Sequence, residues 1–136
     1  KSCIRFIPKN LDFFPRLGEG WVKSKRVLVF EIQNRNQGLN LHIIIGPGDD
    51  KLRSKIYDHM KLDTQIFTNT SRALTKKWFS CYKKSLLASK EIENLEYEDL
   101  KERLNNKFAK FKSTDLPKIL ASLQPLKNEN QLQIKT

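Results

Sequence analysis

Residues 27–45 read VLVFEIQNRNQGLNLHIII, and this stretch decides the fold. Its two ends, residues 27–33 and 39–45, are rich in β-branched and aromatic side chains, which favour strands. The connection between them, residues 34–38, holds two asparagines and Gly38, residue types that tolerate the positive φ angles of a turn. The sequence therefore predicts an antiparallel β-hairpin with a connection of five residues.

The segments before this hairpin add a strand and a loop. Residues 3–7 alternate between apolar and polar side chains and predict a third strand. Residues 8–22 contain two prolines, Gly18 and Gly20, so we expect an irregular loop there. The N-terminal half is thus predicted to form a small antiparallel sheet.

The C-terminal half is predicted to be helical. After Gly46-Pro47-Gly48 ends the hairpin, Asp49 or Asp50 can cap a first helix, and Pro117 suits the first turn of a last one. The predicted helices cover about 50–60, 72–86, 98–111 and a short segment that begins at Ser113 or Thr114 and ends before Pro125. The predicted fold class is α+β, with the small sheet packed against about four helices.

Length and composition predict one domain. A chain of 136 residues with 38% hydrophobic content can build one core, so we expect a single domain over 1–126 and a polar tail over 127–136. The chain begins at Lys1 rather than at a methionine, so we expect a fragment of a longer protein or a trimmed product. Cys3 and Cys81 lie far apart without the spacing of a zinc site, and no apolar run is long enough for a membrane span. These features predict a cytoplasmic location.

The charge of the chain predicts a polyanionic partner. It carries 26 basic and 15 acidic residues, a net charge of +11. Residues 71–90 hold six basic side chains and no acid, whereas residues 91–102 hold six acids against Lys101. Such a basic excess attracts polyanions, of which nucleic acids are one class, and does not by itself distinguish among them.

The basic segment predicts the binding site. If residues 72–86 are helical, 100° per residue places the basic side chains on one arc and Leu74, Trp78, Cys81 and Tyr82 on a separate, buried arc. Phe79 falls beside the basic arc as an exposed aromatic. The predicted nucleic-acid-binding residues are Arg72, Lys76, Lys77, Lys83, Lys84 and Phe79.

Signals for catalysis are weak. A nuclease metal site needs two or three carboxylates and a lysine. Asp12 is the upstream acid considered to join Glu31, and Gln33 stands at the lysine position. We interpret Glu31 as a solvent-facing strand glutamate, and His42 and His59 as structural or surface histidines. We therefore expect no catalytic residue, no metal ligand and no cofactor in this chain.

Several short stretches together resemble a known group of proteins. They are IRFIPK at 4–9, GEGW at 18–21, RVLVFE at 26–31, IIIGPG at 43–48, KW at 77–78, YKK at 82–84 and DLPKI at 115–119. In this order they are similar to the C-terminal region of uncharacterised bacterial proteins of the PD-(D/E)XK nuclease superfamily, often found among phage-defence and mobile-element genes. The resemblance implies an accessory domain whose partner is an N-terminal nuclease domain of the same protein. That domain would hold the Mg²⁺-binding motif, so no catalytic residue carries over to this chain.

Three functional hypotheses follow. The first is an accessory domain that contacts the nucleic-acid backbone, DNA or RNA, through the basic helix. The second is a protein-interaction module whose acidic residues 91–102 and exposed hydrophobic side chains dock a partner subunit or a second copy of the chain. The third is a small or degenerate nuclease core centred on Glu31.

Overall fold

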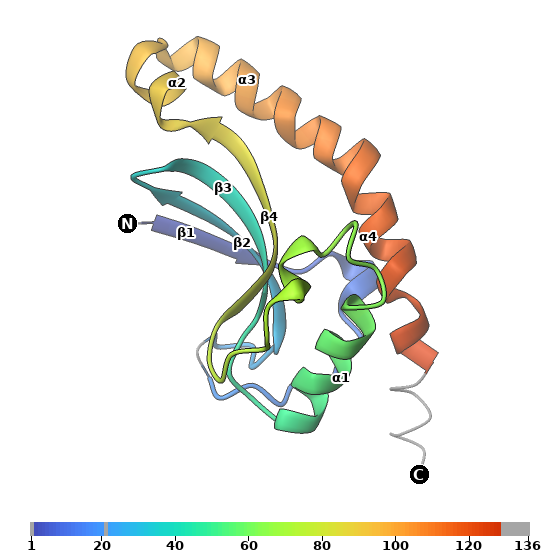
Figure 1. The fold of residues 1–136 in the computed structure, drawn as a ribbon. Helices are drawn as coiled ribbons and strands as arrows, with labels where there is room; N and C mark the ends of the chain where they lie inside the picture. The colour runs from blue at the N-terminus through green and yellow to red at the C-terminus, as the bar shows by residue number, and fades with distance from the viewer. Residues whose placement is uncertain (1, 21, 129–136) are drawn as a thin grey trace.

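The fold is a four-stranded antiparallel sheet with helices on one of its faces (Figure 1). The computed structural model describes residues 2–20 and 22–128. The strands, in their order across the sheet, are β1 (Ser2–Phe6), β2 (Leu28–Arg35), β3 (Gly38–Ile45) and β4 (Phe79–Ala88). The helices are α1 (Asp50–Met60), α2 (Ser89–Asn94), α3 (Tyr97–Lys110) and α4 (Leu116–Leu123). Short 3-10 turns η1 (Lys9–Leu11) and η2 (Thr68–Ser71) and a π-helical turn η3 (Phe111–Asp115) complete the chain of elements. The predicted α+β class is confirmed.

The predicted hairpin is present, with a shorter connection than expected. β2 pairs with β3 over its whole length, from Leu28 opposite Ile45 to Arg35 opposite Gly38. Gly38 has a φ of 108°, and a Cβ at this position would lie 2.2 Å from the carbonyl oxygen of Leu87 in β4. Glycine is therefore required both by the turn and by the close approach of β4.

The helix predicted over 72–86 is wrong. Residues 79–88 form β4, which pairs with β3, and residues 72–78 form the loop that leads into it. Two irregularities in the pairing leave Cys81 and Leu86 as extra residues on β4, and both are buried. These bulges break the two-residue alternation of a strand and give the apolar residues a spacing that imitates a helix. The hydrogen bonds that β3 offers along its edge override the local pattern.

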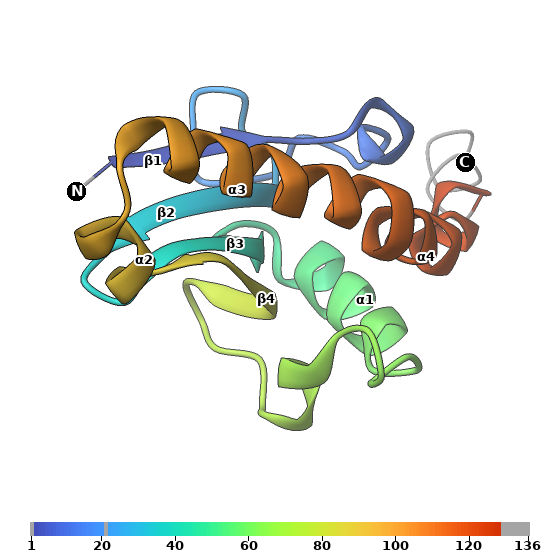
Figure 2. The ribbon, with the colours of Figure 1, turned by 90° about the horizontal axis from the view of Figure 1, so that it is seen from above.

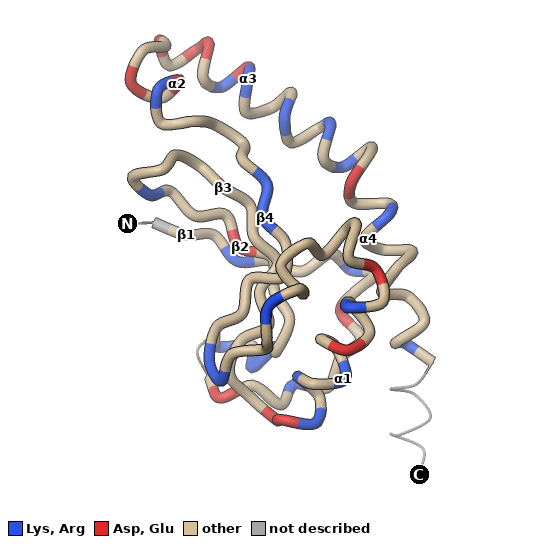
Figure 3. Tube along the Cα trace, in the orientation of Figure 1, with Lys and Arg blue, Asp and Glu red and all other residues tan. Residues whose placement is uncertain are grey.

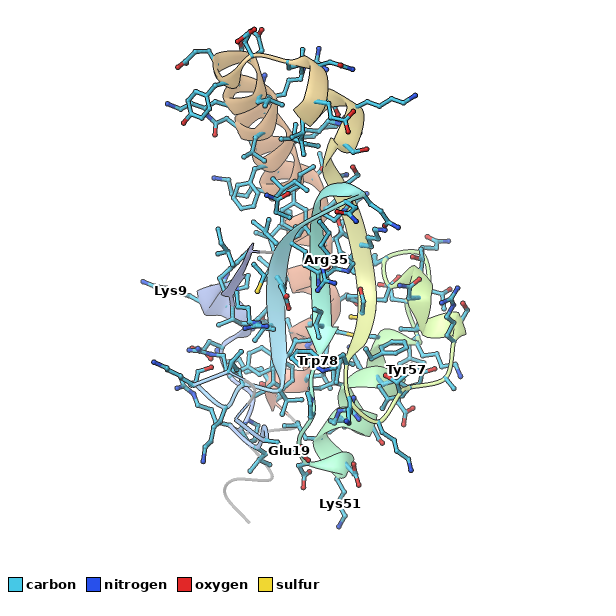
Figure 4. All side chains as sticks on the ribbon, turned by 90° about the vertical axis from the view of Figure 1, so that its left-hand side faces the viewer. Lys9, Glu19, Arg35, Lys51, Tyr57 and Trp78 are labelled. Carbon is cyan, nitrogen blue, oxygen red and sulfur yellow. The ribbon has the colours of Figure 1, made fainter. Side chains whose placement is uncertain are left out.

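One face of the sheet forms the core. Phe30, Leu41 and Ile43 are fully buried and pack in one cluster with Ile56 of α1 and Ile119 of α4. Figure 2 shows α1, α3 and α4 grouped beside the sheet. In Figure 4, none of the helices in the described ranges lies over the opposite face, and α3 and α4 pass behind the strands. We call this helix-free side of the sheet the open face.

Asp49 starts α1 as predicted. Its carboxylate accepts a hydrogen bond of 2.9 Å from the backbone N–H of Leu52. Gly48 before it allows the chain to pass within van der Waals contact of Gly18, with which it forms an isolated β-bridge. The Gly46-Pro47-Gly48 turn therefore joins β3 to α1, and the Asp49 carboxylate already caps the N-terminus of that helix.

The last helix does not begin afresh at Ser113 or Thr114, as the sequence suggested. Residues 111–115 form η3, a π-helical turn that runs directly from α3 into α4. Pro117 lies in the first turn of α4, where its missing N–H removes one bond of the helical ladder. α4 ends at Leu123, before Pro125, as predicted, but helical structure resumes over residues 125–128, which include the first two residues of the predicted polar tail. Residues 129–136 of the predicted polar tail lie outside the described residues. In the described ranges, none of the helices has both the length and the apolar character that a membrane span requires.

Candidate functional site

A row of four polar side chains crosses the open face. The pairing register places Arg5 of β1 opposite Glu31 of β2, Glu31 opposite His42 of β3, and His42 opposite Lys83 of β4. Because neighbouring residues in register project from the same side of a sheet, all four belong to the open face. Each strand therefore contributes one ionisable group to the row.

Glu31 is a buried carboxylate with long hydrogen bonds. Its side chain is 4% exposed. Its Oε2 accepts from Nε of Arg5 at 3.4 Å, and its Oε1 accepts from Nε2 of Gln33 at 3.4 Å. Both distances exceed the usual range for such bonds, about 2.7 to 3.2 Å. The carboxylate is thus buried without the close partners that normally offset the cost of burying a charge.

His42 is held by a short hydrogen bond to β4. Its Nδ1 lies 2.7 Å from Oγ of Ser80, and Ser80 donates to the carbonyl oxygen of Tyr82 at 3.2 Å. Burial is the main reason that the pKa of His42 lies below its usual value, and the positive charges of Lys83 and Arg35 lower it further against the opposing effect of Glu31. The imidazole is therefore neutral at pH 7 and offers one donor and one acceptor.

These side chains surround a hollow. A pocket of about 330 Å³ is lined by the row residues Arg5, Glu31 and His42 together with Arg35 and Trp78. A second hollow of about 660 Å³ lies beside it, shares Arg35 and His42 with it, and reaches Lys83. Figure 4 shows Arg35 and Trp78 above and below one another in front of the strands. The open face therefore carries a continuous polar depression.

Trp78 is placed at the pocket by the loop 72–78. Its side chain is 45% exposed, and the guanidinium carbon of Arg5 lies 5.9 Å from the centre of its ring. The backbone carbonyl of Trp78 accepts a hydrogen bond of 2.7 Å from Oγ1 of Thr75 within the same loop. The loop thus brings an indole ring to the edge of the polar row.

Helix α1 anchors this loop. Arg53 is 3% exposed and donates hydrogen bonds to the carbonyl oxygens of Lys76 at 3.2 Å and Lys77 at 2.9 Å, as well as to that of Gly46 at 2.7 Å. The hydroxyl of Tyr57 lies within hydrogen-bonding distance of the carbonyl of Arg72 at the start of the loop. A buried cation therefore fixes the backbone that carries two lysines and Trp78.

The predicted binding residues do not form one arc, because the helix that would align them does not exist. Arg72, Lys76 and Lys77 are exposed on the loop 72–78, whereas Lys83 and Lys84 lie on opposite sides of β4. Lys83 belongs to the open face. The prediction for the aromatic pair is reversed, since Phe79 is 5% exposed and lies in the core whereas Trp78 is 45% exposed.

Lys84 has a structural partner. Its Nζ lies 3.0 Å from Oδ2 of Asp115 in η3, and the hydroxyl of Tyr82 donates to the same oxygen at 2.7 Å. Burial opposes ionisation of Asp115, yet the hydrogen bonds from Tyr82, Lys84 and Thr114 lower its pKa overall. This cluster ties β4 to the turn between α3 and α4. Basic segments lie on both β4 and α3 (blue in Figure 3).

The carboxylates considered for a metal site have other partners. Asp12 forms an ion pair with Arg26 at 2.7 Å, and hydrogen bonding to Arg26 is the main reason that its pKa is lowered. Glu31 pairs with Arg5. Within residues 2–20 and 22–128, no group of three or more His, Cys, Asp and Glu side chains gathers in a way that could hold a metal ion.

Sequence reasoning missed most of the open face. Arg5, Arg35 and Ser80 were not predicted as site residues, and His42 was interpreted as structural or surface. The alternation of Glu31, Gln33 and Arg35 along one strand was the available signal, because it marks a polar strand face. The partners across the sheet depend on register, which the bulges in β4 hide.

Comparisons with protein-family models, with curated proteins and with solved structures find no match. The resemblance to the PD-(D/E)XK nuclease superfamily therefore stays a prediction.

Proposed function

We propose that this chain is a non-catalytic accessory domain that contacts nucleic acid through the open face of its sheet. The observation that supports this most is the composition of that face, where Arg5, Arg35 and Lys83 surround one buried acid, Glu31. Basic side chains on a sheet face that is free of helices can provide the phosphate contacts from which nucleic-acid affinity mainly derives. The net charge of +11 adds a long-range attraction for polyanions.

The loop 72–78 extends this surface. Lys76 and Lys77 are exposed there, and the buried side chain of Arg53 holds their backbone in place. A fixed backbone lowers the entropy lost when lysines engage phosphates. The proposed contact surface therefore consists of the open face and this loop, in place of the basic helix that the sequence suggested.

Trp78 favours a single strand over a duplex. Bases of single strands stack on aromatic side chains presented by sheets, whereas the bases of a duplex are already stacked on one another. Trp78 lines the same pocket as Arg5 and Arg35, so a base and its flanking phosphates can be engaged together. A single-stranded segment, for example one exposed beside a nuclease domain of the same protein, is the proposed ligand.

The test is a binding titration with single-stranded and duplex oligonucleotides at several salt concentrations. Substituting Arg35, Lys76, Lys77 and Lys83 by Gln should weaken binding and flatten the slope of log affinity against log salt by roughly 3 units for a single strand. A matched control replaces four lysines on the helical side, Lys101, Lys107, Lys110 and Lys118. Equal slopes for parent and open-face variant, with the control variant as the weaker binder, would overturn the proposal.

The proposal also expects binding without cleavage. Incubation of the chain with labelled DNA or RNA in Mg²⁺ or Mn²⁺ should leave the oligonucleotide intact. If cleavage occurred and Glu31→Ala abolished it, a nuclease core centred on Glu31 would replace the accessory role.

A protein-interaction role is a second candidate because of the corner between α2 and α3. Tyr97 is 71% exposed and Ile92 is 37% exposed, within the acidic segment 91–102. Exposed apolar side chains ringed by charge are typical of docking sites. Sedimentation velocity over a concentration series should reveal self-association that the double substitution Ile92→Ser and Tyr97→Ser removes. A monomer at all concentrations excludes the second copy as partner.

A further inference from the structure

The pocket on the open face has a floor that lacks close donors. The Glu31 carboxylate lines this pocket, and its two hydrogen bonds are both 3.4 Å long. A carboxylate accepts up to about four hydrogen bonds, and a buried one left with weak partners is costly. A ligand that brings adjacent N–H groups to Glu31 would therefore gain more here than on an exposed surface.

The surrounding charges exclude a simple cation as that ligand. Arg5 and Arg35 line the same pocket, and Lys83 lies in the next hollow. Three positive charges around one carboxylate repel an ammonium or guanidinium group. The ligand that fits is anionic overall, with N–H donors confined to one edge.

Trp78 sets the shape of the ligand. Trp78 is 45% exposed and lines the pocket. The pocket has a volume of about 330 Å³, at the small end of the usual range of about 300 to 1,000 Å³ for ligand sites. An indole ring at the wall favours a flat, conjugated group that can stack. A nucleobase joined to phosphates meets all three conditions.

We propose that the pocket binds an unpaired guanine base of a single strand, with its N1–H and N2 amino group donating to the Glu31 carboxylate and its ring against Trp78. This inference rests on the proposed function. Guanine presents two adjacent donors on its Watson–Crick edge. Adenine and cytosine present one donor beside an acceptor, and thymine presents one donor between two carbonyl oxygens, which a carboxylate repels.

The first experiment varies the base and leaves the protein unchanged. Parent protein is titrated, at fixed salt, with oligothymidine 12-mers that carry dG, dA, dC or deoxyinosine at one central position, and with the all-thymidine strand. The dG strand should bind about tenfold more tightly than the all-thymidine strand, the scale of a bidentate base contact. The deoxyinosine strand, which lacks the N2 amino group, should fall between them. Equal affinities of all five strands would overturn the proposed guanine site.

The second experiment uses the sign of an electrostatic effect. Glu31→Gln removes a negative charge, so by charge alone it should strengthen binding of every strand. If Glu31 binds guanine, the preference for the dG strand should instead disappear in Glu31→Gln, while binding of the all-thymidine strand is kept or improved. Glu102→Gln on α3 is the matched control, since it removes the same charge from an exposed helical position and should keep the dG preference.

The outcomes separate this inference from the proposed function. Salt-dependent binding without base preference rejects the guanine pocket and leaves the accessory role in place. Absence of binding to all five strands near physiological salt rejects both. A dG preference that persists in folded Glu31→Gln rejects the role of Glu31. If that variant does not fold, the base series on the parent protein decides.

Discussion

At the scale of single residues, Arg53 is a cation that the fold buries in order to hold a loop. We expect Arg53→Met to lower the free energy of unfolding by about 2 to 4 kcal/mol, because it removes charge-assisted bonds to the carbonyl oxygens of Gly46, Lys76 and Lys77. Urea unfolding monitored by circular dichroism measures this loss. Lys51→Met on the exposed side of the same helix is the control and should change stability by less than about 0.5 kcal/mol.

His42 makes stability depend on pH. Because burial above all keeps its pKa in the folded protein below the usual 6.5, the unfolded chain takes up a proton first as the pH falls. The contribution of His42 is therefore fully present above about pH 6.5 and is lost as the pH falls toward the folded-state pKa. We expect the free energy of unfolding, measured with urea at pH 7.5, 6.5 and 5.5, to decline more steeply with falling pH for the parent than for His42→Gln. Parallel declines would contradict this assignment.

Trp78 and Phe79 show why burial could not be predicted residue by residue. The helical interpretation buried Trp78 and exposed Phe79, and the structure does the reverse. Adjacent residues in extended backbone face opposite sides, so treating this segment as a helix misplaced both side chains. The candidate site was lost by the same error, since Trp78 entered the sequence reasoning as a core residue.

Among the elements, β4 carries two adjacent lysines, Lys83 and Lys84, for which we expect different roles. Lys84→Gln should lower stability by about 0.5 to 1 kcal/mol, because it removes a partly exposed ion pair with Asp115, and should leave oligonucleotide binding nearly unchanged. Lys83→Gln should weaken binding and leave stability unchanged. Thermal unfolding and binding measured on both variants test this pair. If the two lysines proved equivalent in both measurements, the assignment of opposite faces would be wrong.

The predictability of each element follows from where its information lies. The hairpin and α1 were predicted correctly, because strand-forming runs, a turn and an acidic N-cap are local signals. β4 was not, because its identity depends on hydrogen bonds to β3 and on bulges at Cys81 and Leu86. The polar row across the four strands depends on the registers of β1 with β2, β2 with β3 and β3 with β4. The sequence pattern of a single strand contains none of these registers.

At the scale of the whole molecule, the excess of positive charge predicts opposite responses to salt. Raising NaCl from about 20 to about 200 mM should raise the melting temperature by a few degrees, because screening reduces self-repulsion within a chain of charge +11. The same change should weaken oligonucleotide binding, because each counterion that is released gains less entropy in the more concentrated salt. Differential scanning fluorimetry and binding titrations in matched buffers check both signs. A melting temperature that falls with salt would indicate that attractive ion pairs dominate.

None of the fourteen residues of helix α3 is buried, so we expect this helix to unfold locally before the sheet does. Its N-terminal turns leave the sheet in Figure 1, and only Leu104 and Phe108 pack against the core from the side. Amide hydrogens of α3 should therefore exchange with deuterium through local fraying, whereas those of β2 and β3 should exchange only on global unfolding. A ligand on the open face would leave the exchange of the α3 amides unaltered, whereas a protein docked at Tyr97 would slow it. Exchange mass spectrometry thus reads out which of the two surfaces a given partner uses.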